Sequence, residues 1–349
     1  MIKIFISLIL ISLLINFCIC FLFKKAKIVD KPDGVRKKHK GEISYGGGIA
    51  LFLSSIVILF ASSKFSLSFY GQGSELTIIW LVSFIMLILG LWDDIKPLAT
   101  SVRLIIQIFA SWLVIIITDV YLRDFGNLFG LGDLYIGQIG IPLTIFMVVG
   151  VINAFNMLDG IDGLVVLVLS VASLSISLLL FMENSSGFIF LASFSLLSFL
   201  PFNLGLFGKN WKMFLGDSGS MWLGFLTAWL LIFLSQDGID GVFSPVTALW
   251  LILIPLIDAL STFISRIWNR KSMFLGDRSH IHHMLLDLGF KKWKVLLILL
   301  VISVVSAIFA VTSIYLNLSE YYQFYGFLTI WFFYFLLVKY PTIKNRNIS

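Results

Sequence analysis

The chain has 349 residues, of which 59% are hydrophobic and only 13% are charged, and its net charge is +6. Soluble globular proteins are roughly 45–50% apolar and about 25% charged. The composition therefore excludes an ordinary soluble protein and predicts a protein that crosses a membrane several times.

Apolar runs long enough to cross roughly 30 Å of hydrocarbon recur along the chain. Because lipid satisfies no backbone hydrogen bonds, and because the runs show no period-2 alternation, we expect them to be helices. The expected fold is an all-α polytopic membrane protein with about eleven transmembrane helices in one domain that covers residues 1–349. The expected spans are 2–23, 43–63, 76–92, 101–118, 139–158, 163–182, 187–208, 218–236, 241–264, 295–318 and 321–338.

Basic residues are concentrated in every second loop between these spans, which places most of them on the same side of the membrane. If the N-terminus is outside, 22 of the 25 Lys and Arg residues fall in the inner loops and the tail, and the exceptions are Lys3, Lys64 and Arg123. This distribution predicts a periplasmic N-terminus and a cytoplasmic C-terminus. The positive net charge is thus a topology signal, and no nucleic acid is expected as a partner. The longest outer loop, 119–140, combines glycines with alternating apolar residues and is expected to form a small hairpin.

With this topology, every dense polar cluster lies on the inner face of the membrane. All four histidines of the chain, His39, His280, His282 and His283, belong to these clusters. In chain order the clusters are KPDGVRKKHKGEISYGGG (31–48), GLWDDIKPL (90–98), NMLDGIDGL (156–164), FLGDSGS (214–220) and GDRSHIHHMLLDLG (276–289).

Several carboxylates lie at or within the predicted membrane boundaries. They are Asp93, Asp94, Asp159, Asp162, Asp217 and Asp258. A charge in this position costs a few kcal/mol, and like charges that gather at one mouth repel, so a cation must bind or some of the groups must be protonated. The alternatives are solvation at the interface and neutralisation by loop lysines. Oxygen ligands without accompanying cysteine favour Mg²⁺, with Mn²⁺ as a second candidate.

The histidines allow more than one interpretation. In HIHH, His280 and His283 are three residues apart and are expected to share a helical face, which is one arrangement for zinc. A zinc site needs three or four suitable ligands, and no cysteine or HExxH partner is present. Arg278 beside them would repel a cation, so a role in holding phosphate is the preferred hypothesis, with a structural role as the alternative.

The three glycines at 46–48 either let a ligand approach the backbone or allow a close contact between helices. Taken together, the clusters predict metal-assisted phosphoryl transfer, in which carboxylates hold Mg²⁺ and basic groups neutralise phosphate oxygens. Because the clusters lie at the membrane face, one substrate is expected to be a lipid. The other would arrive from the cytoplasm carrying phosphates.

Five segments resemble motifs of the polyprenyl-phosphate N-acetylhexosamine-1-phosphate transferases, the glycosyltransferase 4 family, in the same order over residues 1–338. They are Lys31–Gly48, Trp92–Asp94, Asn153–Leu164, Phe214–Ser220 and Asp277–His283. The RKKHKGEI and DRSHIHH segments, with SPVTALW (244–250), look most like the branch that uses undecaprenyl phosphate and UDP-N-acetylglucosamine. Ser44 and Gly276 stand where the family often has proline.

The resemblance implies roles for individual residues. Asp217 would be the principal Mg²⁺ ligand, with Asp93 and Asp94 as further ligands that orient the lipid phosphate or take its proton. Asp159, Asp162, His282 and His283 would belong to the catalytic set. The substrate-binding set would comprise Arg36, His39, Asn153, Asn156, Arg266, Arg278 and His280.

The implied reaction starts the synthesis of O-antigen or another cell-surface glycan in the inner membrane of a bacterium. The expected partners are UDP-N-acetylglucosamine and undecaprenyl phosphate, and a homodimer is left open. The alternatives are another UDP-N-acetylhexosamine, or phospho-MurNAc-pentapeptide as the transferred group.

A cation-coupled transporter is a remote alternative. Transporter sites lie near the midplane and often in inverted repeats, whereas the acidic residues of this chain gather at one predicted face and its sequence shows no repeat. The DGxxAR spacing of the CDP-alcohol phosphotransferases is missing.

Overall fold

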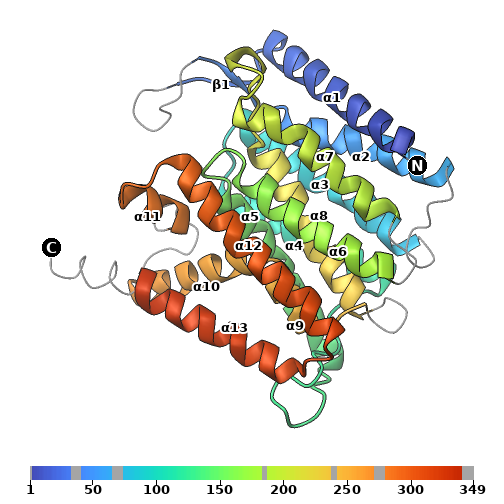
Figure 1. Ribbon diagram of the computed structural model, residues 1–349, viewed down its shortest axis with the longest axis vertical. Coiled ribbons are helices and arrows are strands. Elements are labelled where there is room, and N and C mark those ends of the chain that lie inside the picture. The colour runs from blue at the N-terminus through green and yellow to red at the C-terminus, as the bar shows by residue number, and fades with distance from the viewer. Residues whose placement is uncertain are drawn as a thin grey trace.

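The computed structural model describes residues 2–32, 41–64, 74–182, 187–236, 242–270 and 280–339, and these residues form a bundle of helices (Figure 1). An antiparallel pair of two-residue strands, β1 (Val29–Asp30) and β2 (Ile43–Ser44), lies at one end. The helices are α1 (Ile2–Lys25), α2 (Gly47–Lys64), α3 (Ser74–Ile95), α4 (Thr100–Thr118), α5 (Gly140–Leu158), α6 (Leu164–Met182), α7 (Gly187–Leu204), α8 (Gly216–Gln236), α9 (Pro245–Leu251), α10 (Leu253–Trp268), α11 (Ile281–Asp287), α12 (Lys292–Tyr315) and α13 (Glu320–Tyr334).

The helices have the length and composition of membrane spans. Within the described residues, six helices are long and apolar enough to cross a membrane, and the bent pair α9 and α10 would make a seventh. Shorter apolar helices cover 47–60, 164–180 and 193–204. Every predicted span overlaps a helix, so the polytopic helical class is supported. The number of eleven crossings and the orientation of the termini stay predictions.

The single predicted span 241–264 is wrong in one respect, because the structure divides it into α9 and α10, which meet at an angle of 93°. The break lies at Ile252, whose φ and ψ are −124° and 38°. Pro255 has no N–H to donate to the Leu251 carbonyl, and its ring clashes with that carbonyl in a continuous helix. The proline was visible in the sequence, but the hydropathy of the segment gave no sign of the bend.

From Asp258 onward, helix α10 buries its polar residues and exposes apolar ones, whereas its first turn buries apolar residues. Asp258, Thr262 and Arg266 are buried, whereas Phe263 and Ile267 on the other side are exposed. This inverted pattern is typical of a helix whose polar face points into the protein and whose apolar face meets lipid.

The centre of the bundle is α8, which packs against α2, α3, α5 and α9. In the most apolar stretch of α8, 78% of the residues are buried inside the protein. The corresponding share is 28–39% in the other spanning candidates among the described residues. Trp222 on α8 donates from its indole to the Ser83 hydroxyl on α3 at 2.8 Å. The environment of α8 is therefore almost entirely protein rather than lipid.

Glycines allow α2 and α3 to approach the start of α8 at backbone distance. A Cβ on Gly90 would collide with the backbone carbonyl of Asp217, and a Cβ on Gly48 would lie 2.5 Å from the backbone nitrogen of Gly219. The Gly47 and Gly48 amides donate to the carbonyls of Phe214 and Leu215 at 3.1 and 3.2 Å. Of the two interpretations of the triple glycine, this structure supports the close helix contact.

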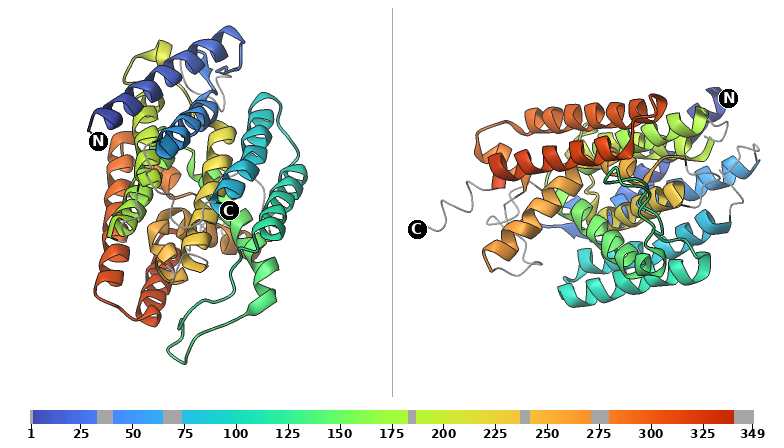
Figure 2. Two further views of the ribbon diagram at one scale, coloured as in Figure 1. Left: turned by 90° about the vertical axis from the view of Figure 1, so that its right-hand side faces the viewer. Right: turned by 90° about the horizontal axis from the view of Figure 1, so that it is seen from below.

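The loop between α4 and α5, which the sequence predicts on the outer side, projects from the bottom of the molecule (Figures 1 and 2). The predicted hairpin is reduced here to one isolated antiparallel bridge between Asp124 and Tyr135. The Gln236 side chain at the end of α8 accepts from the Arg123 and Asp124 amides at 2.8 and 3.1 Å and donates to the Asp124 carbonyl at 2.8 Å. The loop is thus tied to the central helix at the end opposite to Asp217.

We expect Gly90→Ala to destabilise the bundle, because the added methyl group forces α3 away from the start of α8. Overpacking of this kind costs about 1–3 kcal/mol, and a lower melting temperature of the purified protein in detergent would report it. Gly150→Ala is the matched control, since nothing lies within 4 Å of a Cβ there. That control should melt at the same temperature or higher. Equal melting of the two variants would contradict the backbone contact.

Candidate active site

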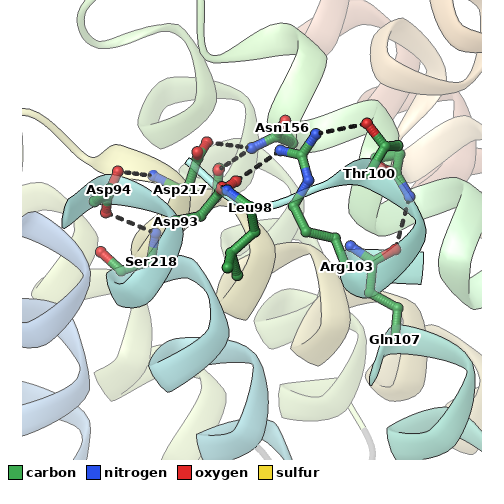
Figure 3. Close-up of polar contacts among 11 residues, drawn as sticks. Asp93, Asp94, Leu98, Thr100, Arg103, Gln107, Asn156, Asp217 and Ser218 are labelled. Atoms are coloured by element: carbon green, nitrogen blue, oxygen red, sulfur yellow. Dashed lines mark hydrogen bonds and ion pairs between the residues drawn. The ribbon is translucent and has the colours of Figure 1, made fainter. Parts of the chain in front are cut away.

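The acidic motifs predicted from the sequence meet where α3 ends and α8 begins (Figure 3). The Asp94 carboxylate accepts from the backbone amides of Asp217 and Ser218 at 2.8 and 3.1 Å. A carboxylate of one helix thus caps the positive end of another, which satisfies amides that have no partner within α8. Gly216 makes room for it, because its φ is +74° and an added Cβ would lie 2.7 Å from an Asp94 oxygen.

Asp217 is held from a third helix. The Asn156 amide at the end of α5 donates to Asp217 Oδ1 at 2.6 Å and to the Ser220 hydroxyl at 3.1 Å. Asn156 and Asp217 had both been predicted as site residues, and the structure brings them together. Ser220, which the sequence analysis did not select, completes the link between the motifs at 153–164 and 214–220.

Asp93 is buried and has a cationic partner. Arg103 in the first turn of α4 donates to Asp93 Oδ2 at 2.7 Å, and the Leu98 amide donates to Oδ1 at 2.6 Å (Figure 3). Arg103 was missed in the sequence analysis. Arg103 is the one basic residue of α4 and follows Asp93 by ten residues across a short turn, and this spacing could have indicated an ion pair between them.

Asp162 and Asp159 follow α5 and differ in their environment. Asp162 forms an ion pair with Lys212 at 2.8 Å, so neutralisation by a loop lysine holds for this residue. The pKa of Asp159 is raised well above its usual range, first by burial and then by the nearby charges of Asp217, Asp162 and Asp94. The neighbouring carboxylates thus disfavour a charge on Asp159, and a cation bound there would relieve their repulsion.

Asn153, one turn before Asn156, faces α4. Its amide donates to Gln107 Oε1 at 2.9 Å and to the Val149 carbonyl at 2.7 Å. Gln107 lies one turn after Arg103 on α4 and is buried. The structure thus gives Asn153 a partner on the neighbouring helix α4, and its predicted substrate-binding role stays a prediction.

The histidine segment begins the short helix α11. His280 precedes this helix with extended φ and ψ of −77° and 151°, so the predicted shared helical face with His283 is wrong. His282 is fully buried, and a Cβ on Gly160 would collide with its imidazole. The His282 and His283 rings lie 4.2 Å apart. Gly160 therefore allows the histidine segment to pack directly on the 156–164 motif.

Other predicted residues are placed less completely. Arg266 is buried on α10. Arg36, His39 and Arg278 lie outside the described residues. The strands β1 and β2 flank the basic segment 31–42, and the Tyr45 hydroxyl donates to Asp30 Oδ1 at 2.5 Å.

The donor atoms of the acidic cluster determine which metal it suits. In the part of the chain that the structure describes, no three His, Cys, Asp or Glu side chains are arranged to hold a metal ion by themselves. Asp94 is engaged with α8, and Asp93 with Arg103. The Asp217 and Asn156 side chains supply oxygen donors beside them. Such a set fits Mg²⁺, which usually takes one or two carboxylates and completes its shell with water and substrate phosphate.

The chain is similar to known proteins over most of its length. The model of "Glycosyl transferase family 4" matches residues 76–235, which run from α3 to α8 and contain the acidic cluster. A Pasteurella multocida protein is 33% identical over 337 residues, covering 93% of this chain and 92% of its own. A Salmonella typhi protein is 31% identical over 319 residues (90% and 84%), and an Escherichia coli K12 protein is 32% identical over 288 residues (82% and 76%). All three are named undecaprenyl-phosphate alpha-N-acetylglucosaminyl 1-phosphate transferase.

We expect Arg103→Met to destabilise the protein because it leaves the buried Asp93 carboxylate without its cation. Loss of one partner of a buried polar pair costs about 1–3 kcal/mol, and the lower end applies because the Arg103 side chain is 25% exposed. Asp93→Asn combined with Arg103→Met removes both charges and should restore part of the melting temperature. A double variant no more stable than Arg103→Met would argue against the ion pair.

Proposed function

Because the chain belongs to glycosyl transferase family 4, we propose that it transfers N-acetylglucosamine 1-phosphate from UDP-N-acetylglucosamine to undecaprenyl phosphate. An oxygen of the lipid phosphate attacks the β-phosphorus of the nucleotide sugar, and the bond between that phosphorus and the bridging oxygen of UMP breaks. The products are undecaprenyl-diphosphate-N-acetylglucosamine and UMP. This reaction would start the synthesis of lipopolysaccharide O-antigen or another surface glycan at the bacterial inner membrane.

The observation that carries the proposal is the acidic cluster formed by the ends of α3 and α5 and the start of α8. Carboxylates concentrated at one end of a membrane bundle are suited to a cation that in turn binds phosphate. When bound, Mg²⁺ would supply charge neutralisation of the phosphate oxygens. We assign Asp217 as its principal protein ligand, oriented by the hydrogen bond from Asn156 at 2.6 Å.

The other acidic residues have distinct roles in this proposal. Asp94 fixes the start of α8 and so the position of Asp217. Asp93 accepts from the Leu98 amide with one oxygen and from Arg103 with the other, and the Arg103 cation stabilises its charged form. A phosphate monoester has its second pKa near about 6 and is already largely a dianion at pH 7. The attack therefore needs positioning rather than a strong general base, and Asp93 serves better as the partner of Arg103.

Cationic and hydrogen-bonding groups would hold the nucleotide sugar opposite the acidic cluster. His282 packs on Gly160 of the 156–164 motif and His283 lies beside it, so we assign this segment to the side of the cleft where a diphosphate would bind near Asp159. Arg266 on the polar face of α10 and the basic residues Arg36, His39 and Arg278 are further candidates. A cation-coupled transporter is a weaker proposal, because the carboxylates gather at helix ends and the relatives carry transferase names.

The direct test is UMP release by the purified protein with undecaprenyl phosphate, Mg²⁺ and a series of UDP-sugars. We expect turnover with UDP-N-acetylglucosamine, none with UDP-glucose, and complete loss in EDTA that excess Mg²⁺ restores. Asp217→Asn should lower turnover by at least about 100-fold, because several kcal/mol of charge stabilisation is lost. Asp133→Asn, in the exposed outer loop, is the matched control. Normal turnover of Asp217→Asn would place the metal ligand elsewhere, and inactivity with every UDP-sugar would refute the proposal.

A second prediction separates the histidines from the metal site. If His282 and His283 hold the diphosphate, their contacts strengthen as negative charge develops on the departing UMP oxygen while the β-phosphate passes to the lipid phosphate. Replacing either residue with alanine should then lower kcat by about 10²–10³ and raise KM by a smaller factor. The Mg²⁺ concentration for half-maximal activity should stay unchanged. A loss of Mg²⁺ affinity in proportion to the loss of activity would instead identify the histidines as ligands.

A further inference from the structure

A carboxylate that the proposed reaction does not use lies inside the protein on α10. Asp258 is only 3% exposed. One of its oxygens is 2.8 Å from His280 Nδ1, and the other accepts from the Ile281 amide at 3.1 Å and from the Tyr334 hydroxyl at 2.6 Å. A buried carboxylate is costly unless it is paired and hydrogen-bonded, so these donors account for its presence there.

The donors belong to different parts of the chain. His280 and Ile281 begin α11, and Tyr334 ends α13. The Ile281 amide is one of the first of α11, which has no partner within that helix. Asp258 thus satisfies the start of α11 while Tyr334 fixes the carboxylate from the opposite side.

Helix α11 needs such an anchor because it is short. It has seven residues, and isolated helices below roughly 12–15 residues are marginal in water. His280 directs one ring nitrogen at Asp258, and its ring lies parallel to that of His282 at 5.9 Å. His282 in turn packs on Gly160. A continuous set of contacts therefore joins Tyr334 on the C-terminal helix to the motif that contains Asp159.

We propose that Asp258 and Tyr334 are positioning residues for the histidine segment: they hold His280, and through α11 they place His282 and His283 against the 156–164 motif. The hydrogen bond to Asp258 fixes which nitrogen of His280 carries the shared proton and how the ring is turned, as carboxylates do for histidines in metal and catalytic sites. Neither Asp258 nor Tyr334 touches substrate in this proposal. The effect of this positioning on turnover rests on the proposed function.

The experiment compares Tyr334→Phe with Tyr325→Phe on the same helix. The first change removes a hydroxyl that donates to Asp258, whereas Tyr325 is 49% exposed. Hydrogen–deuterium exchange of the peptide covering 280–288, measured on the full-length protein in detergent, reports how firmly α11 is held. We expect exchange on the order of tenfold faster in Tyr334→Phe and no change in Tyr325→Phe. Unchanged exchange in Tyr334→Phe would overturn the proposal, whether or not the protein transfers a sugar phosphate.

The transfer assay adds a readout that a general loss of stability would not mimic. Tyr334→Phe should lower kcat by roughly tenfold, since one hydrogen bond to a buried charge is lost. In a His280→Ala background the same change should alter kcat less than about twofold, because the residue it acts through is gone. Independent, multiplicative effects would overturn the positioning role. Absence of transfer by the unmodified protein would refute the proposed function alone, and the exchange comparison would still decide this inference.

Discussion

The approach of α3 to the start of α8 is the constraint on which the rest of the site depends. Gly90 lets the two backbones touch, and the Asp94 carboxylate then bonds the first amides of α8. Once these helices are fixed, Asp217 faces Asn156 at the end of α5, and Asp93 lies within reach of Arg103 on α4. The positions of Asp93, Asp94 and Asp217 thus depend on one interhelical contact, which any side chain on residue 90 would prevent.

The charges at this end are arranged so that repulsion is only partly relieved by the protein. Arg103 and Lys212 neutralise Asp93 and Asp162, while Asp159 and Asp217 have no ion pair with Lys or Arg among the described residues. Such an arrangement costs stability in the absence of a bound cation. The same unrelieved negative field is what would attract a metal ion in the proposed function.

The sequence was informative where hydropathy and motif composition decide the structure, and less so where contacts join distant segments. Helix positions were predictable, since apolar runs must be helical in lipid, and the motifs identified Asn156 and Asp217 as site residues without showing that they touch. The Pro255 break, the Asp93–Arg103 pair and the packing of His282 on Gly160 were not predicted. Those features depend on interhelical distances, which a single sequence does not contain.

The inverted surface of α10 has a consequence for what counts as the folded protein. Its buried side carries Asp258, Thr262 and Arg266, and its outer side carries Phe263 and Ile267. Exposed apolar side chains such as Phe263 and Ile267 are favourable in an apolar medium and unfavourable in water. The medium around this half of α10 therefore helps to keep its polar side inward, and a detergent that covers the outer side poorly would weaken that preference.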